Sequence, residues 1–273
     1  MQLCMNDVTI MKHSDLLSRI SAAGDAGFPA MEIRKAAILQ AIREGCRIAD
    51  IRRALERAGI ELACVNAVDS ISFNGKRGTA IHSEAAEYLF YLVRELGCSM
   101  VEVIGTFKAP TEDPAEIRKE TAEALLRLSD LARPYGINLG LEFMGLPASS
   151  VKTLGQSLEI LEDVNRDNVG ILFDSWHHYA AGGTVEEILK VRPEQMFMVH
   201  VSDCPERAPL TARRSESWLP GEGVVPIAAQ LAALKQIGYD GPVSAEIMSP
   251  EVQDMPLSDC LAACRDTLLP LLP

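Results

Sequence analysis

Several features that would assign the chain to other classes of protein are missing from its sequence. No apolar run reaches the roughly 18 residues that span a bilayer, although 48% of the residues are hydrophobic. The first residues, Met1 to Asn6, show no basic patch followed by an apolar stretch and a small-residue cleavage site, which an export signal would carry. We therefore expect a soluble protein in the cytoplasm.

The cysteines are too irregular for a disulfide framework. The chain has seven of them, an odd number scattered from Cys4 to Cys264 without a Cys-x-x-Cys pair. Cys260 and Cys264 are one helical turn apart, and adjacent turns of a helix hold such residues apart. We therefore expect buried free thiols.

Positive charge is also scarce. The chain has 26 lysine and arginine residues against 38 aspartate and glutamate residues, which gives a formal net charge of −12. This charge repels phosphodiester backbones, so it argues against non-specific nucleic-acid binding. A small neutral substrate fits the composition better.

What the sequence does contain is an alternation of short β-branched or apolar runs with longer segments of helical periodicity. This pattern is typical of parallel strands joined by crossover helices. We expect eight strands: Gln2–Asn6, Ala30–Arg34, Glu61–Ala67, Met100–Ile104, Asn138–Phe143, Val169–Asp174, Met196–Ser202 and Val243–Ile247. Eight such units and a length of 273 residues predict one (β/α)8 TIM-barrel domain over residues 1–273. A doubly wound sheet is the alternative, but no Gly-x-Gly-x-x-Gly follows the first strand.

Helical segments with recognisable ends lie between these strands. Glycine or asparagine follows most of them, as expected at a helix C-terminus. The expected helices are Ser14–Ala26, Ala49–Ala58, Ser83–Leu96, Asp113–Pro134, Leu154–Val164 and Ile227–Ile237.

Four of the strands end in residues that bind metals: Glu142, Asp174, His200 and Glu246. The C-terminal ends of barrel strands carry active sites. A single carboxylate there is commonly a helix cap or the partner of an arginine. Three buried carboxylates together are costly without a cation, so the set predicts one divalent metal ion. One imidazole among carboxylates favours Mn²⁺ or Mg²⁺, with Zn²⁺ and Co²⁺ as alternatives.

The residues around these strand ends resemble the xylose-isomerase-like sugar isomerase and epimerase superfamily. The resemblance rests on the segments Leu141-Glu142-Phe143, Phe173-Asp174-Ser175-Trp176-His177, Val199-His200-Val201-Ser202-Asp203, Pro220-Gly221-Glu222-Gly223 and Ala245-Glu246, in this order. It is strongest toward the bacterial inosose (2-keto-myo-inositol) isomerases of inositol catabolism, extends to Leu3-Cys4-Met5-Asn6, Met31-Glu32-Ile33-Arg34 and Val65-Asn66-Ala67, and covers essentially the whole chain.

The resemblance implies roles for individual residues. Glu142, Asp174, His200 and Glu246 match the metal ligands of the family, and His177 matches a histidine that contacts substrate oxygen. Asp203 either holds His200 through a hydrogen bond or caps the following loop.

Three further residues are candidates for the barrel mouth. Glu32 and Asn66, at strand ends, are candidates for substrate hydrogen bonds, with an ion pair between Glu32 and Arg34 as the structural alternative. Trp176 can provide a flat wall for a sugar or cyclitol ring, with core or lid packing as its alternative.

One position departs from the family pattern. Many relatives carry an arginine three residues before the Pro-Gly of the loop that follows the seventh strand, and Ser217 stands there in this chain. Arg213 or Arg214 can substitute from nearby to bind the substrate, with a solvated loop pair as the alternative.

The implied reaction is the isomerisation of a keto-cyclitol or ketose through an enediolate, with 2-keto-myo-inositol as the first substrate. Glu142 and Glu246 would then move the proton. A ketose 3-epimerase and an inosose-type dehydratase use the same intermediate and are the alternatives.

Two rivals come from other classes of protein. An apurinic-site endonuclease is disfavoured by the five histidines and the acidic charge, and a non-catalytic sugar-binding barrel remains as a rival. A homo-oligomer is compatible with this family, and we expect no nucleic-acid or membrane partner.

Overall fold

The computed structural model describes residues 1–273, and its centre is a closed barrel of eight parallel strands that pair in sequence order. The strands are β1 (Gln2–Asn6), β2 (Ala30–Arg34), β3 (Glu61–Val68), β4 (Met100–Ile104), β5 (Asn138–Glu142), β6 (Val169–Asp174), β7 (Met196–Val201) and β8 (Pro242–Ala245). β8 pairs with β1, which closes the barrel. The expected (β/α)8 barrel is therefore confirmed, and the doubly wound sheet is excluded.

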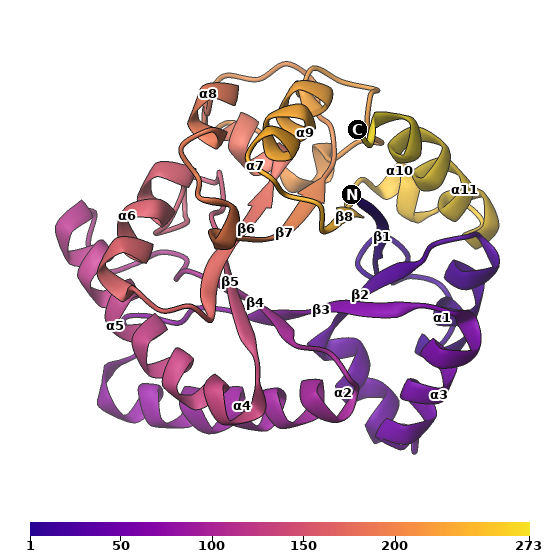
Figure 1. The fold of residues 1–273 in the computed structure, drawn as a ribbon, viewed down its shortest axis with the longest axis horizontal. Coiled ribbons are helices and arrows are strands. Elements are labelled where there is room, and N and C mark those ends of the chain that lie inside the picture. Colours follow the sequence, from indigo (N-terminus) through magenta and orange to yellow (C-terminus); the bar gives the residue numbers. More distant parts are fainter.

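The helices form a ring around the strands (Figure 1). They are α1 (Leu16–Asp25), α2 (Lys35–Arg43), α3 (Ile48–Ala58), α4 (Gly75–Glu95), α5 (Pro114–Ala132), α6 (Leu154–Val164), α7 (Ser175–Ala180), α8 (Val185–Ile188), α9 (Ile227–Gln236), α10 (Pro250–Gln253) and α11 (Leu257–Leu268), with short 3-10 turns at Arg133–Tyr135, Pro193–Gln195, Arg214–Glu216 and Leu269–Leu271. None of the helices is both long and apolar enough to cross a membrane.

The strand positions agree with the sequence expectation to within two residues, whereas the helices differ more. α4 begins at Gly75 rather than at Ser83, because its first two turns are polar and lack apolar periodicity. α2 and α7 were not expected, because each follows its strand directly, without a turn signal to separate the two elements. α8, α10 and α11 were also missed, and the first two have only four residues each.

α6 illustrates how local signals place the site-bearing strands. Thr153 accepts a hydrogen bond from Gln156 N at 3.2 Å, and the Gln156 side chain accepts one from Thr153 N at 3.3 Å. This reciprocal capping box starts the helix. Asn165, in the left-handed region with φ of 43°, ends it. The chain thereby returns from the end of β5 to the start of β6.

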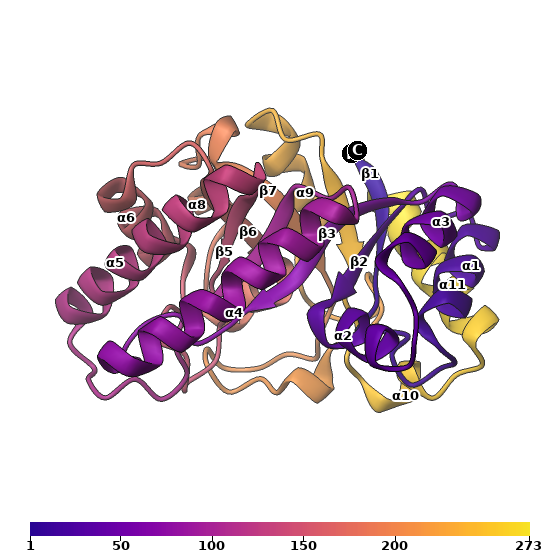
Figure 2. The same ribbon diagram turned by 90° about the horizontal axis from the view of Figure 1, so that it is seen from below.

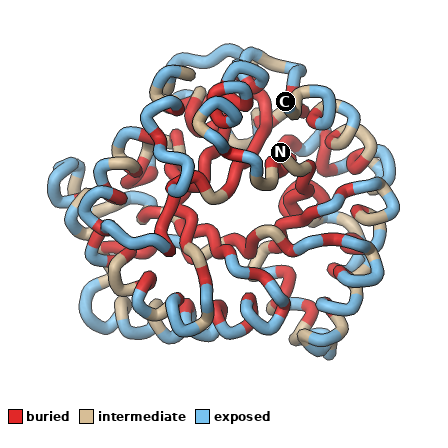
Figure 3. The backbone as a smooth tube through the Cα atoms, in the orientation of Figure 1, coloured by how far each residue is buried: buried red, intermediate tan, exposed pale blue.

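The core lies inside the barrel and between the strands and the helices. Figure 3 shows the strands as buried along most of their length and the outer turns of the helices as exposed. Every residue of β6 is buried, as expected for a parallel strand covered on both faces. The seven cysteines are free, and Cys260 and Cys264 are buried in α11.

The two ends of the barrel have different roles. Figure 2 shows α10 and the loop that follows β7 at one end, and both termini at the other. Because the chain enters β1 from its N-terminus, the end away from the termini is the one where the strands finish. The polar residues that end β5 to β8 therefore meet at the end covered by α10 and by the β7 loop.

Candidate metal centre

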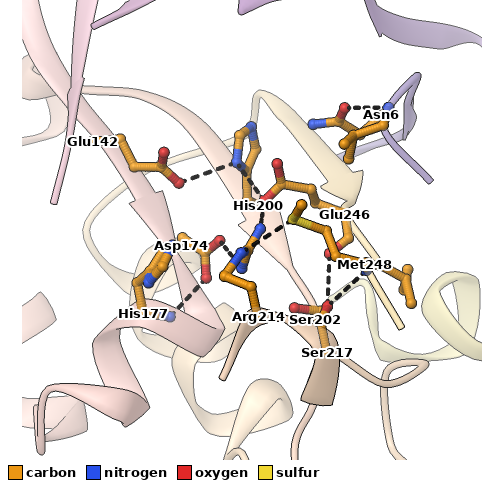
Figure 4. A network of polar contacts seen from close by, with 12 residues as sticks. Asn6, Glu142, Asp174, His177, His200, Ser202, Arg214, Ser217, Glu246 and Met248 are labelled. Carbon is orange, nitrogen blue, oxygen red and sulfur yellow. Dashed lines mark hydrogen bonds and ion pairs between the residues drawn. The ribbon is translucent and has the colours of Figure 1, made fainter. Parts of the chain in front are cut away.

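Four side chains converge where β5 to β8 end. Glu142 and Asp174 are the last residues of β5 and β6, His200 lies in β7 opposite Asp174, and Glu246 directly follows β8. All four are buried, and one potential ligand atom from each lies within 4.8 Å of the others. Figure 4 shows Glu142 and Glu246 on opposite sides of His200. The structure thus brings together the four residues that were expected as metal ligands.

Three of the atoms that face one another in this cluster lack hydrogen-bond partners. Glu142 Oε1, Asp174 Oδ2 and His200 Nδ1 are buried and unpartnered. His200 Nδ1 lies 3.4 Å from Glu142 Oε1 and 3.4 Å from Glu246 Oε2. Buried polar atoms are normally satisfied. Three carboxylates and one imidazole nitrogen turned toward a common point are a donor set that fits a divalent cation.

The charges in the cluster perturb one another strongly. Burial raises the pKa of Asp174 to about 7, with Arg214 opposing the rise and Glu142 adding to it. Burial alone would raise the pKa of Glu246, but Arg214 and His200 hold it well below its usual value. Burial lowers the pKa of His200, yet the charges of Glu32 and Glu246 outweigh burial and raise it. Positive charge at Arg214 and His200 thus offsets the burial of Asp174 and Glu246.

Arg214 supplies part of this positive charge. Its Nη2 donates a hydrogen bond to Glu246 Oε2 at 2.7 Å, and its Nη1 lies 3.7 Å from Asp174 Oδ2. The guanidinium carbon lies 5.2 Å from the ring centre of Trp176, within range of a cation–π contact. Arg213, the other candidate, is exposed. The arginine that points into the site is thus Arg214.

Ser217, which stands where relatives carry an arginine, has a structural contact. It is fully buried, and its hydroxyl donates to Glu246 O at 3.1 Å and accepts from Met248 N at 3.2 Å. These two bonds hold the backbone beside Glu246. The hydroxyl therefore fixes the chain that carries one of the four cluster residues.

His177 lies beside the cluster with a defined tautomer. Asp174 Oδ1 accepts a hydrogen bond from His177 N at 2.8 Å and so caps α7. His177 Nδ1 accepts from Gly145 N at 3.0 Å, so the ring hydrogen is on Nε2. Burial and Arg214 lower the pKa of His177 well below its usual value, which keeps the ring neutral. Its Nε2 is buried and unpartnered, and is therefore available as a donor.

Two other expected substrate contacts have different surroundings. Trp176 is fully buried beneath the Arg214 guanidinium, and its ring centre lies 4.9 Å from that of His177. It thus belongs to the buried core in α7, as in the core-packing alternative, rather than to an exposed loop. Asn66 is buried in β3, and its Oδ1 has no hydrogen-bond partner.

The ion pair between Glu32 and Arg34 was a wrong expectation. Arg34 Nε donates instead to Asp7 Oδ2 at 2.9 Å, because Asp7, just past the end of the neighbouring strand β1, offers a buried carboxylate. Glu32 Oε2 lies 2.9 Å from His200 Nε2, and Glu32 Oε1 accepts from Asn6 at 3.4 Å. Glu32 therefore contacts His200 at Nε2, the ring nitrogen that does not face Glu142 and Glu246.

Asp203 also requires a correction, because it does not hold His200. Its carboxylate accepts hydrogen bonds from the backbone nitrogens of Cys204, Gly221 and Val225 at 2.9, 3.0 and 2.8 Å. Of the two roles considered for Asp203, the loop cap is the one that the structure contains, since three backbone donors of the β7 loop saturate the carboxylate.

Sequence reasoning missed Glu102, which is buried in β4. Its carboxylate lies within 4.8 Å of ligand atoms of Glu32 and His200. Burial, together with the nearby Glu142, raises the pKa of Glu102 well above its usual value. The signal was a glutamate inside the apolar run Met100-Val101-Glu102-Val103-Ile104, where a charged residue needs a reason to be buried.

Comparison with known proteins gives the class to which this fold and this site belong. The model of the xylose isomerase-like TIM barrel family matches residues 20–262, and the chain belongs to this family. The expected family is thus confirmed over nearly the whole chain.

Individual proteins of known name and one solved structure are similar to this chain. A protein named inosose isomerase from Bacillus velezensis is 31% identical over 271 residues, which are 98% of this chain and 95% of that protein. A Methylomonas protein named L-ribulose 3-epimerase is 27% identical over 192 residues, which are 70% of this chain and 63% of that protein. Among solved structures, the IOLI protein, crystallised with a zinc atom, has a TM-score of 0.95 and 27% identity, covering 100% of this chain and 98% of its own.

The cluster makes a direct prediction about metal binding. Replacing Asp174 with Asn keeps the hydrogen bond that caps α7 but removes one anionic ligand, so we expect at least about a tenfold loss of Mn²⁺ and Zn²⁺ affinity. Titration calorimetry measures this loss. In the wild type, an ion at 100 times its dissociation constant should also stabilise the fold by about 2.7 kcal/mol.

The matched control for this substitution is Asp254→Asn, at a carboxylate that is 64% exposed and pairs with Lys12 away from the cluster. It should bind metal like the wild type. Equal affinity of Asp174→Asn and the wild type would contradict a metal site at these four residues.

Proposed function

We propose that this chain is a divalent-metal-dependent isomerase that interconverts keto-cyclitols through an enediolate, with 2-keto-myo-inositol as its substrate in inositol catabolism. The observation that carries the proposal is the pair of buried carboxylates, Glu142 and Glu246, on opposite sides of one cation-binding cluster (Figure 4). The match to an inosose isomerase over 98% of the chain supports the substrate class.

The proposed reaction needs a metal ion and two proton-transfer groups. Glu142, Asp174, His200 and Glu246 would hold a divalent ion, which would polarise a substrate carbonyl and so acidify the proton on the neighbouring carbon. One of the carboxylates Glu142 and Glu246 takes that proton, and the other returns a proton at the adjacent carbon or on the opposite face.

The remaining residues orient the substrate. His177 offers a neutral Nε2–H donor, and the guanidinium of Arg214 has a buried Nη1 without a hydrogen-bond partner. Both can bind substrate oxygens, and the Arg214 fork can hold two oxygens at once. Trp176 lies beneath Arg214 and limits how deeply a ring can enter. Of the two other residues expected at the substrate, Glu32 already contacts His200, whereas Asn66 has a buried Oδ1 without a hydrogen-bond partner that can accept from a substrate hydroxyl.

We propose Mn²⁺ as the ion, since three carboxylates make the donor set rich in oxygen. The zinc atom in the IOLI structure makes Zn²⁺ the first alternative, followed by Mg²⁺ and Co²⁺. We further propose that residues 1–273 form one domain. The seven free thiols support a cytoplasmic location.

Ketose 3-epimerisation is the second candidate function, and the match to an L-ribulose 3-epimerase supports it. It uses the same pair of carboxylates, so substrate and product, rather than the site, distinguish the two reactions. A dehydratase would differ in expelling a hydroxyl group from the enediolate instead of reprotonating it.

Incubation of the Mn²⁺-loaded protein with 2-keto-myo-inositol in deuterium oxide tests the reaction, with NMR following the protons beside the carbonyl and the products. We expect exchange that depends on the metal and a new keto-inositol with an unchanged carbon skeleton. Glu246→Gln should slow this exchange at least about 100-fold, because it removes one proton-transfer group. Glu251→Gln, at an exposed glutamate of α10, is the matched control.

Three outcomes would count against parts of the proposal. Undiminished exchange in Glu246→Gln would exclude the proton-transfer role of this residue. A product that has lost one water molecule relative to the substrate would make the protein a dehydratase. No exchange with keto-inositol, but turnover of fructose, tagatose or psicose, would move the assignment to the epimerase.

Substitutions at Arg214 and at the neighbouring Arg213 test whether Arg214 binds the substrate. Arg214→Lys keeps the positive charge but loses the planar fork, so we expect kcat/KM to fall about 10- to 100-fold, as for the loss of a hydrogen bond to a charged group. Arg213→Lys, one residue earlier and exposed, should leave kcat/KM near the wild-type value. Similar kinetics in both variants would show that Arg214 does not bind the substrate.

A further inference from the structure

The second ring nitrogen of His200 has one hydrogen-bond partner. Its Nε2 lies 2.9 Å from Glu32 Oε2, and both residues are fully buried. The other nitrogen, Nδ1, faces Glu142 and Glu246. The two ring nitrogens therefore contact different groups: Nδ1 faces the cation-binding cluster, and Nε2 contacts a carboxylate from β2.

Glu32 is in turn held by the first strand. Asn6 Nδ2 donates to Glu32 Oε1 at 3.4 Å, and Asn6 Oδ1 accepts from Val8 N at 3.0 Å. The backbone donor fixes which end of the amide is the oxygen, so the NH2 group must face Glu32. A hydrogen-bonded chain thus runs from the β1 loop through Asn6 and Glu32 to His200.

The tautomer of His200 decides whether it can bind a metal from Nδ1. A neutral imidazole carries one ring hydrogen, and the nitrogen without it offers the lone pair. An acceptor at Nε2 places the hydrogen there and leaves the Nδ1 lone pair for the cluster. Without Glu32, no other side chain hydrogen-bonds to Nε2.

We propose that Glu32 is a positioning residue that fixes the ring and the tautomer of His200 through the chain Asn6–Glu32–His200, so that Nδ1 binds the divalent ion. This inference rests on the metal site of the proposed function. Partners of this kind raise metal affinity about 10- to 100-fold.

The geometry favours this role over direct substrate binding by Glu32. Both of its carboxylate oxygens have partners, and the side chain has no exposed surface. Glu102, the other carboxyl in this part of the barrel, makes no hydrogen bond to His200, and its Oε2 is unpartnered. Glu32 is therefore the residue that hydrogen-bonds to Nε2 of His200.

Two variants of Glu32 test the proposal with Zn²⁺ alone as the probe. Glu32→Met keeps the length of the side chain and removes both oxygens, and we expect Zn²⁺ affinity to fall about 10- to 100-fold. Glu32→Gln retains one acceptor but turns an NH2 group toward the Asn6 NH2, so its loss should be smaller. Glu61→Gln, at an exposed glutamate of β3, is the matched control and should bind like the wild type.

A second readout follows the ring itself. The chain has only five histidines, so ¹⁵N-histidine NMR of the zinc-loaded protein can resolve each ring, with His200→Gln assigning the signal. We expect a zinc-shifted Nδ1 and a hydrogen on Nε2 with the low-field shift of a strong hydrogen bond. That Nε2–H signal should move to higher field in Glu32→Met. If Glu32→Met does not fold, Glu32→Gln gives the affinity comparison.

The outcomes separate this inference from the proposed function. Wild-type protein that binds no Zn²⁺ would overturn the metal site and this role of Glu32 together. Zn²⁺ binding that depends on Asp174, combined with wild-type affinity in a folded Glu32 variant, would overturn the role of Glu32 and leave the metal site intact.

Discussion

The mutual repulsion of three buried carboxylates constrains the whole barrel mouth. Glu142, Asp174 and Glu246 cannot all be ionised in a water-poor site unless positive charge lies among them. Arg214 provides some of that charge, and a divalent ion bound by a neutral His200 would provide the rest. One potential ligand atom from each of these carboxylates and from His200 lies within 4.8 Å of the others, and Glu142 Oε1, Asp174 Oδ2 and His200 Nδ1 have no hydrogen-bond partner.

Most of the fold, and the convergence of the four candidate metal ligands, could be predicted because they depend on local patterns. Strand periodicity fixed β1 to β8, and parallel strands that close a barrel must bring their carboxyl ends together. Residues at those ends, such as Asp174 and Glu246, therefore meet whatever the details of the loops. His177 was expected from the family resemblance, and it lies beside the cluster because α7 begins directly after β6.

The partners of individual side chains could not be predicted, because they depend on contacts between distant elements. Glu32 and His200 are 168 residues apart, and their contact requires the closed barrel. Asp203 lies close to His200 in sequence, yet its carboxylate turns to the backbone of the β7 loop. Arg213 and Arg214 are neighbours, and only the short 3-10 turn decides which guanidinium faces the site.

Anomalous diffraction from Mn²⁺-soaked crystals tests the central claim most directly, because it locates the ion without reference to any substrate. We predict one strong anomalous peak within bonding distance of Glu142, Asp174, His200 Nδ1 and Glu246, with the Arg214 guanidinium hydrogen-bonded to Glu246 beside the ion. A peak elsewhere, or no peak within bonding distance of these four residues at saturating Mn²⁺, would contradict it.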